Sequence, residues 1–386
     1  MRQIIDAIPW KPRFCVYETT LRCNMRCRHC GSAAGRARPD ELTPEEARKL
    51  LNELCDLGLE RLTLSGGEPL LREDWPDMAR LLRDRGVAVT MISNGYMFDL
   101  AAARTSRDVG LRTVGFSIDG DEESHTYVRR IKDSYARIMQ AIEFCNEVGQ
   151  PFSVVTHLSK RTIPRLFALL EVLLEKKPNC WQIQLGSPMG NMPREDVVDD
   201  DDLVSLTGLF EEIYRRTEGK FRVYAGDCVG YYDPLEQVHR KENRFGFWTG
   251  CMAGIQGIGI ESNGNVRGCL SIQATDVVEG NARLTPLREI WTRPDAFAYN
   301  RRFEPSMLGG FCAECEYGDI CRAGCKSMAY ATTGNPHDNP MCIHRVRVQR
   351  GIEPRRPRSS LGGLAEPAAR APSEEPPGRG VNETRC

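Results

Sequence analysis

The sequence lacks the features that would place a protein in a membrane or on a nucleic acid. No apolar run approaches the roughly 20 residues of a membrane-spanning helix. The formal net charge is −1, so there is no basic excess for a nucleic-acid backbone. Residues 1–6 contain no apolar core of a signal peptide. We therefore expect a cytoplasmic protein without membrane or nucleic-acid partners.

Cysteine, by contrast, is abundant, with 16 residues in a chain of 386. In a reducing compartment such a number favours metal binding over disulfide bonds. The apolar content of 41% is ordinary, and the length allows two domains. The spacing of the cysteines is therefore the main guide to function.

Three cysteines, Cys23, Cys27 and Cys30, form a C-x3-C-x2-C loop after the apolar, β-rich run at residues 14–20. Such a loop can bring three thiolates to one iron–sulfur cube and leave the fourth iron open for a small molecule. Structural zinc sites require four ligands, so half of a zinc site is a weaker interpretation, as are buried structural cysteines. The loop predicts an iron–sulfur site.

Short β-rich runs alternate with amphipathic segments in the first half of the chain. One helix signal is a capping box of Thr43 and Glu46, with Pro44 at the first helical position. Further helices are expected near residues 75–85, 134–148, 164–176 and 202–216. The expected strands are residues 14–20, 61–65, 88–93, 113–118, 152–158 and 181–185, with one more at 221–224. This alternation predicts an α/β fold with a parallel sheet, a partial (β/α)6 TIM-like barrel whose site lies at the C-terminal strand ends.

Polar motifs follow the second, third and fourth expected strands. A Gly-Gly pair would let the backbone approach a ligand, and a carboxylate or carbonyl can accept from an ammonium group. Each motif alone is also typical of a simple turn, and Arg129 could be a solvated charge beside Arg130. The candidate binding residues are Gly66, Gly67, Glu68, Pro69, Ser93, Asn94, Ser117, Asp119 and Arg129.

Residues 225–345 contain a second group of cysteines with a defined spacing. Cys251 is followed by Gly264 and, after four further residues, by Cys269; the segment 257–267 is typical of a β-hairpin with an Asn-Gly turn. The pattern continues as C-x2-C-x5-C-x3-C and one last cysteine, at Cys312, Cys315, Cys321, Cys325 and Cys342. A zinc ribbon is the alternative, because C-x2-C pairs also suit zinc.

These motifs together resemble the radical SAM superfamily, and the second cysteine pattern resembles its SPASM extension. The resemblance covers roughly residues 14–345 and implies S-adenosylmethionine and three [4Fe-4S] clusters as cofactors. Cys23, Cys27 and Cys30 would hold the cluster that reduces S-adenosylmethionine. A first auxiliary cluster would take Cys251, Cys269 and Cys325, and a second Cys312, Cys315, Cys321 and Cys342.

The resemblance also implies contacts to S-adenosylmethionine. His29 would lie beside the adenine, and the Gly-Gly-Glu-Pro motif at residues 66–69 would contact the methionine amino group. Ser117 and Asp119 would hold the ribose hydroxyls, and Arg129 the methionine carboxylate.

The first auxiliary cluster lacks a fourth cysteine in the place where many members of the family have one, because residues 241–250 contain none. The nearest upstream cysteine is Cys228, whose neighbouring glycines suit a loop that folds back. We expect Cys228 to be the fourth ligand. An open iron that binds a substrate thiolate, and a Cys228 unrelated to any cluster, are the alternatives.

The chain is thus expected to have four parts. They are a lead-in at 1–13, a radical SAM partial barrel at 14–224, a SPASM domain with a β-hairpin and two auxiliary clusters at 225–345, and a tail at 346–386. The tail has almost no large apolar residues and is expected to be disordered.

The resemblance implies an enzyme whose 5′-deoxyadenosyl radical abstracts a hydrogen from a substrate. That substrate would be a ribosomally made peptide or a protein side chain, which is crosslinked, joined by a thioether, epimerised or oxidised. A flavodoxin- or ferredoxin-like reductant is implied, and the peptide would be recognised by a separate protein or by the groove between the domains.

Two alternatives differ from this function. A sulfatase-maturing enzyme would carry Asp where this chain has Leu270, and a cluster-bearing electron-transfer protein would not need the intact motif at 66–69. No general base stands out; Asp227, Tyr231, Tyr232 and Asp233 lie between the expected domains and could face the radical or form an ordinary loop.

Overall fold

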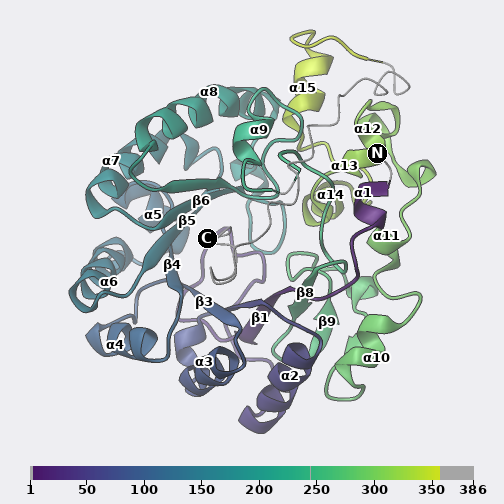
Figure 1. Cartoon of the computed structure of the whole chain (residues 1–386). Coiled ribbons are helices and arrows are strands. Elements are labelled where there is room, and N and C mark those ends of the chain that lie inside the picture. Colours follow the sequence, from purple (N-terminus) through teal and green to yellow (C-terminus); the bar gives the residue numbers. More distant parts are fainter. Residues whose placement is uncertain (1–2, 244, 357–386) are drawn as a thin grey trace, which may run out of the picture.

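The computed structural model describes residues 3–243 and 245–356. At its centre is a curved sheet in the order β10-β9-β8-β1-β2-β3-β4-β5-β6-β7. Strands β1 to β7 are parallel and follow chain order, with helices on the outer face (Figure 1). They are β1 Phe14–Thr20, β2 Arg61–Gly66, β3 Ala88–Ser93, β4 Thr113–Ser117, β5 Phe152–Leu158, β6 Cys180–Leu185 and β7 Arg222–Ala225. The predicted parallel α/β sheet is confirmed, and it is open, with β7 and β10 at its two edges.

The barrel helices cover the sheet with apolar faces. Helix α2 (Pro44–Asp56) begins with the predicted capping box of Thr43 and Glu46, and buries Leu50, Leu51 and Leu54. The other barrel helices are α3 Trp75–Asp84, α4 Leu100–Asp108, α5 Glu122–Arg129, α6 Ser134–Val148, α7 Leu166–Lys176 and α8 Asp200–Thr217. Helices α4 and α5 were not predicted, because their short, polar sequences show no clear apolar period; α4 buries only Ala103 and Ser106.

The cysteine-rich region continues the same sheet. The predicted hairpin is present as β8 (Gly257–Ile260) and β9 (Asn265–Arg267), with Gly264 at φ +90° in its turn, and β10 (Gly280–Asn281) extends it. Strand β8 pairs in parallel with β1, in the register Phe14 to Gly257. One hydrophobic core runs through both regions. The loop that follows β1 and the ends of the hairpin are therefore held on neighbouring strands.

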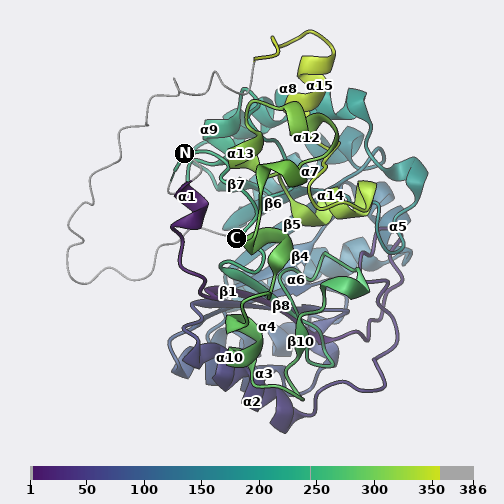
Figure 2. The same ribbon diagram turned by 90° about the vertical axis from the view of Figure 1, so that its right-hand side faces the viewer.

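The remainder of this region consists of short helices that run along one side of the sheet (Figure 2). They are α9 Glu236–His239, α10 Leu287–Thr292, α11 Ala298–Arg301, α12 Gly310–Glu314, α13 Gly318–Cys321, α14 Lys326–Thr333 and α15 Ile343–Gln349; α1 (Gln3–Asp6) lies in the lead-in. Helix α15 spans residue 345, where the sequence analysis placed the end of the SPASM domain. The predicted disorder from residue 357 onward lies outside the described residues. No helix in the described part of the chain is long and apolar enough to cross a membrane.

Candidate active site and metal centres

The loop after β1 brings its three cysteines together. Burial, together with the nearby charges of Glu68, Cys27 and Cys30, raises the pKa of Cys23 to about 11. Backbone N–H groups donate to two of the sulfurs, from Met25 to Cys23 (3.4 Å) and from Ala34 to Cys30 (3.3 Å). Three soft sulfur donors with N–H groups directed at them suit an iron–sulfur cluster.

The glycines of the motif at residues 66–69 allow close approach of the backbone to this loop. The N–H groups of Gly67 and Glu68 donate to the carbonyls of Thr20 (2.8 Å) and Arg22 (2.9 Å). A Cβ atom on Gly67 would lie 2.2 Å from the Arg22 carbonyl oxygen. The pair therefore fixes the backbone on which the three cysteines are mounted.

The Glu68 side chain is fully buried and joins β2 to the end of β3. Its carboxylate accepts from the Ser93 hydroxyl (2.8 Å) and from the Asn94 N–H (2.9 Å). Burial raises the pKa of Glu68 to about 7, although these two donors favour the charged form. Asn94 in turn donates to Asn24 (2.7 Å), next to Cys23. Both carboxylate oxygens are thus engaged within the chain, while Pro69 is buried at the start of a short 3-10 turn.

A second polar group gathers at the ends of β4 and β5. Asp119 is fully buried, and its carboxylate lies 2.6 Å from Arg129 Nη2, 2.7 Å from His157 Nδ1 and 3.8 Å from His29 Nε2. The rings of His29 and His157 lie 3.9 Å apart. Although burial raises the pKa of Asp119, Arg129 and the two histidines hold it well below its usual range. Ser117, at the end of β4, is half-buried.

Arg129 is therefore not the solvated charge that was the alternative to a binding role. Its side chain is 9% exposed and also lies 3.7 Å from Cys27 Sγ. It connects the cysteine loop to Asp119. His157 was missed by the sequence analysis, because a single histidine in a strand carries no motif.

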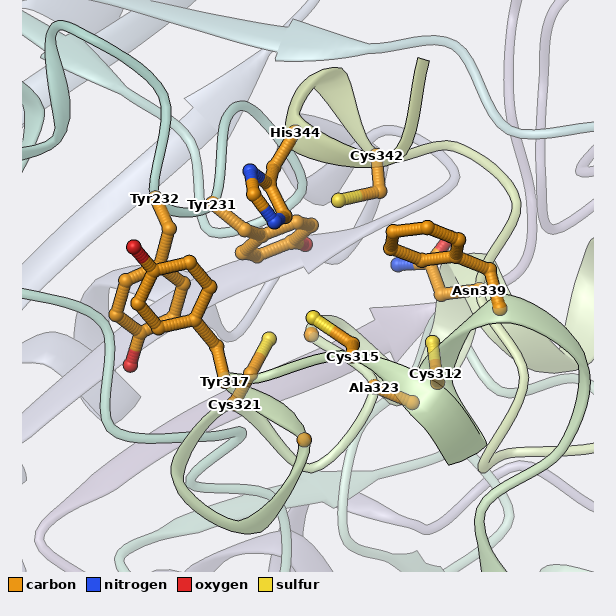
Figure 3. Close-up of a pocket in the computed structure, with 13 residues that line it drawn as sticks. Tyr231, Tyr232, Cys312, Cys315, Tyr317, Cys321, Ala323, Asn339, Cys342 and His344 are labelled. Atoms are coloured by element: carbon orange, nitrogen blue, oxygen red, sulfur yellow. The ribbon is translucent and has the colours of Figure 1, made fainter. Parts of the chain in front are cut away.

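Four C-terminal cysteines line one pocket together with three tyrosines, Tyr231, Tyr232 and Tyr317 (Figure 3). Their sulfur atoms point toward a common space in Figure 3. Burial raises the pKa of the Cys321 thiol well above its usual value, and the other three thiolates raise it further. We call this the second auxiliary set: Cys312, Cys315, Cys321 and Cys342.

Three further cysteines of the described residues, Cys228, Cys251 and Cys269, form a separate group around Cys325. Burial raises the pKa of the Cys325 thiol well above its usual value, and the thiolates of Cys251, Cys228 and Cys269 add to this shift. Cys228 accepts a hydrogen bond from the Leu185 N–H (3.2 Å) at the end of β6. We call this the first auxiliary set: Cys228, Cys251, Cys269 and Cys325. The structure thus places Cys228 beside Cys251, Cys269 and Cys325, the cysteines of the cluster that it was expected to ligate.

The side chains considered as general bases are held within the protein. The Tyr224 hydroxyl donates to Asp227 (2.6 Å), and the buried Asp233 lies 3.5 Å from His239. The Tyr231 hydroxyl donates to the Asp227 carbonyl (2.7 Å) and accepts from the Cys325 N–H (2.9 Å). Tyr231 therefore lies between the two auxiliary sets, since its ring lines the pocket of the second.

Comparisons with known proteins identify the family. The family model of the radical SAM superfamily matches residues 17–163, and that of SPASM, an iron–sulfur cluster-binding domain, matches residues 251–316. The AdoMet-dependent heme synthase of Methanosarcina barkeri (strain Fusaro / DSM 804) is 31% identical over 86% of this chain and 97% of that protein. The chain belongs to the radical SAM superfamily and carries a SPASM domain. S-adenosylmethionine and iron–sulfur clusters are thereby implied as cofactors.

Other relatives also match over most of the chain. The Fe-coproporphyrin III synthase of the same organism is 29% identical over 85% of this chain and 86% of that protein. The PqqA peptide cyclase of Bradyrhizobium diazoefficiens is 22% identical over 86% of each chain. The crystal structure of Streptococcus suis SuiB bound to S-adenosylmethionine superposes with a TM-score of 0.70 at 17% identity, covering 88% of this chain and 79% of that one. That likeness shows a common fold.

Proposed function

We propose that this chain is a radical SAM oxidoreductase that modifies a carboxylate side chain of a tetrapyrrole, as a heme synthase would. The observation that carries the proposal is the similarity to a heme synthase, which extends over 97% of that relative at 31% identity. The Fe-coproporphyrin III synthase and the pre-heme d1 synthase of Dinoroseobacter shibae, 25% identical over 85% of each chain, are also named for tetrapyrrole products.

The reaction we infer converts a propionate side chain into a vinyl group. A cluster bound by Cys23, Cys27 and Cys30 would supply the electron that cleaves S-adenosylmethionine to a 5′-deoxyadenosyl radical. This radical would take one hydrogen atom from the propionate. Loss of the carboxylate as CO2 would leave a carbon–carbon double bond and release one electron, which a cluster held by one of the auxiliary cysteine sets would accept.

The chain's own residues would bind S-adenosylmethionine at the carboxyl ends of β1 to β5. Because both Glu68 oxygens are engaged, we assign Glu68 to positioning the loop at 66–69, whose backbone would meet the methionine amino group. Arg129 and Asp119 remain the proposed contacts to the carboxylate and the ribose, with Ser117 at the same edge. His29 is proposed beside the adenine, and His157 joins this group through Asp119.

Three [4Fe-4S] clusters would be present, one in the N-terminal loop and one in each auxiliary set. The proposal is supported by the separation of the C-terminal cysteines into two groups, each with its own mutual thiolate interactions. Cys228 would be the fourth ligand of the first auxiliary set. A flavodoxin- or ferredoxin-like protein would supply electrons.

A peptide substrate is the second candidate, as the sequence analysis expected. It is favoured by the similarity to PqqA peptide cyclases, at 22 to 24% identity. A separate peptide-recognition protein would then be a partner. A sulfatase-maturing function is disfavoured, because this chain has Leu270 at the position where such enzymes would carry an aspartate.

A direct assay distinguishes the two candidates. Anaerobically reconstituted protein is incubated with S-adenosylmethionine, dithionite and Fe-coproporphyrin III, and the products are separated by mass. We expect loss of CO2 and two hydrogens per propionate, with 5′-deoxyadenosine formed in step. An unchanged tetrapyrrole, together with a mass change in a co-expressed peptide encoded beside the gene, would instead establish the second candidate.

A further inference from the structure

Lys326 is a buried cation in the region that holds the auxiliary cysteines. It follows Cys325 at the start of α14 and is 0% exposed. Its ammonium donates to the Arg322 carbonyl (2.7 Å), lies 3.0 Å from His337 Nδ1 and is 5.4 Å from the centre of the Phe303 ring. None of these three contacts is a carboxylate. A buried charge without a countercharge is unfavourable, so the negative partner of Lys326 must be sought nearby.

Lys326 directly follows Cys325 of the first auxiliary set, and its ammonium donates to the carbonyl of Arg322, which directly follows Cys321 of the second set. Burial lowers the pKa of Lys326 to about 8, and the neighbouring Arg322 cation also lowers it, whereas the thiolates of Cys251, Cys321 and Cys312 act against this shift. The backbone N–H of Lys326 donates to Cys251, and the Phe303 ring under the ammonium belongs to the same small buried cluster as Cys312. Lys326 therefore lies between the sets.

We propose that Lys326 is the counter-cation of the two auxiliary cysteine sets and raises the reduction potential of the clusters they hold. The inference rests on the proposed cluster assignment. A cubane with thiolate ligands carries net negative charge, and its potential depends on the charge around it. A fixed positive charge stabilises the reduced, more negative state, which makes the cluster a better acceptor for the electron released by the substrate.

The same charge has opposite effects in the loaded and iron-free protein. With iron bound, the ammonium is compensated, and it slows the loss of iron. Without iron, the thiols are protonated and the ammonium has no countercharge, so it destabilises the fold. A residue that served only to pack the region would have the same sign of effect in both states.

The test uses Lys326→Met, which keeps the length of the side chain and removes its charge. The full chain carries Cys23→Ala, Cys27→Ala and Cys30→Ala, so that only auxiliary clusters remain. We expect the midpoint potential of at least one cluster to become more negative in redox titrations followed by electron paramagnetic resonance. Iron release to a chelator should be faster, while the iron-free variant should resist urea at least as well as the iron-free parent.

Two further variants keep the test decisive. Lys326→Gln, also neutral, should repeat the shift in potential if Lys326→Met fails to fold. Arg301→Met is the matched control, because Arg301 is a buried cation that donates to the Gly254 and Trp291 carbonyls (2.6 and 2.7 Å). It should destabilise the loaded and the iron-free protein alike. If a neutral variant of Lys326 keeps its iron and its clusters have the midpoint potentials of the parent, the proposal is overturned. If the parent, the triple alanine variant with Lys326 intact, contains no auxiliary iron, the cluster assignment is overturned and this inference with it.

Discussion

The barrel and the cysteine-rich region bury different kinds of side chain. In the barrel, apolar residues such as Leu51, Trp181 and Phe210 are 0% exposed. In the cysteine-rich region the helices are short, and the buried side chains include three thiols of the second auxiliary set and the Lys326 ammonium. Apolar burial stabilises the barrel by itself, whereas clustered thiols and a buried cation are stabilised when metal is bound. We therefore expect iron to serve chemistry in the first region and both chemistry and folding in the second.

The largest expected effect comes from removing the three cysteines of the barrel loop. Cys23→Ala, Cys27→Ala and Cys30→Ala together should abolish formation of 5′-deoxyadenosine, because these cysteines are the proposed ligands of the cluster that would reduce S-adenosylmethionine. The auxiliary iron should stay, since its ligands lie elsewhere. Cys55→Ala, a half-buried cysteine on α2 outside all three groups, serves as the control and should keep full activity. Residual 5′-deoxyadenosine in the triple variant would falsify the assignment of this loop.

A core substitution in the barrel should act independently of iron. Leu51→Ala on α2 should lower the free energy of unfolding by about 2–5 kcal/mol, because it leaves a cavity at a fully buried position. Urea unfolding followed by tryptophan fluorescence should show similar losses with and without iron. Leu284→Ala, at an 82% exposed leucine, should change little. A loss for Leu51→Ala that disappears in iron-free protein would contradict the contrast between the regions.

The buried Glu68 should make the barrel sensitive to pH. Its pKa is raised from 4.5 to about 7, so the folded state holds a proton that the unfolded state has released. This contribution to stability is fully present below pH 4.5 and is lost as the pH rises through 7. Glu68→Gln should therefore reduce the loss of stability between pH 5 and pH 8, by on the order of 3 kcal/mol. The free energy of unfolding is measured at pH 5 and pH 8. The control Glu147→Gln, at an exposed glutamate, should leave the difference between the two pH values unchanged.

The smallest effect is expected at Asp119. Asp119→Asn removes the charge that pairs with Arg129 and His157, while leaving the cysteine sets intact. Binding of S-adenosylmethionine should weaken by about 1–3 kcal/mol, or about 5- to 150-fold in Kd. Calorimetric titration at constant iron content measures this. An unchanged Kd for S-adenosylmethionine would show that Asp119 has only a structural role.

The repeating part of the fold was predictable from the sequence. All strands from β1 to β7 lie within one residue of their expected bounds, because each is a compact β-rich run between helices. The hairpin was found through its Asn-Gly turn. The parallel pairing of β8 with β1 was not, since a contact across more than 200 positions leaves no local signal.

The candidate site was predictable only where spacing carries the chemistry. The cysteine groups follow from their spacing and family resemblance, and the structure adds Cys228 to the group around Cys325. The partners of Glu68, the Asp119–His157 contact and the burial of Lys326 arise from tertiary packing. Single polar residues carry no pattern that would reveal such contacts.

The most direct measurement of the central claim is the iron and acid-labile sulfide content of anaerobically reconstituted protein. We predict about twelve irons per chain, with about four lost from each of three variants. These are the triple alanine variant of the barrel loop, Cys251→Ser with Cys325→Ser, and Cys321→Ser with Cys342→Ser. About four irons in the wild-type chain, accompanied by zinc, would contradict the assignment of the auxiliary sets as iron–sulfur sites.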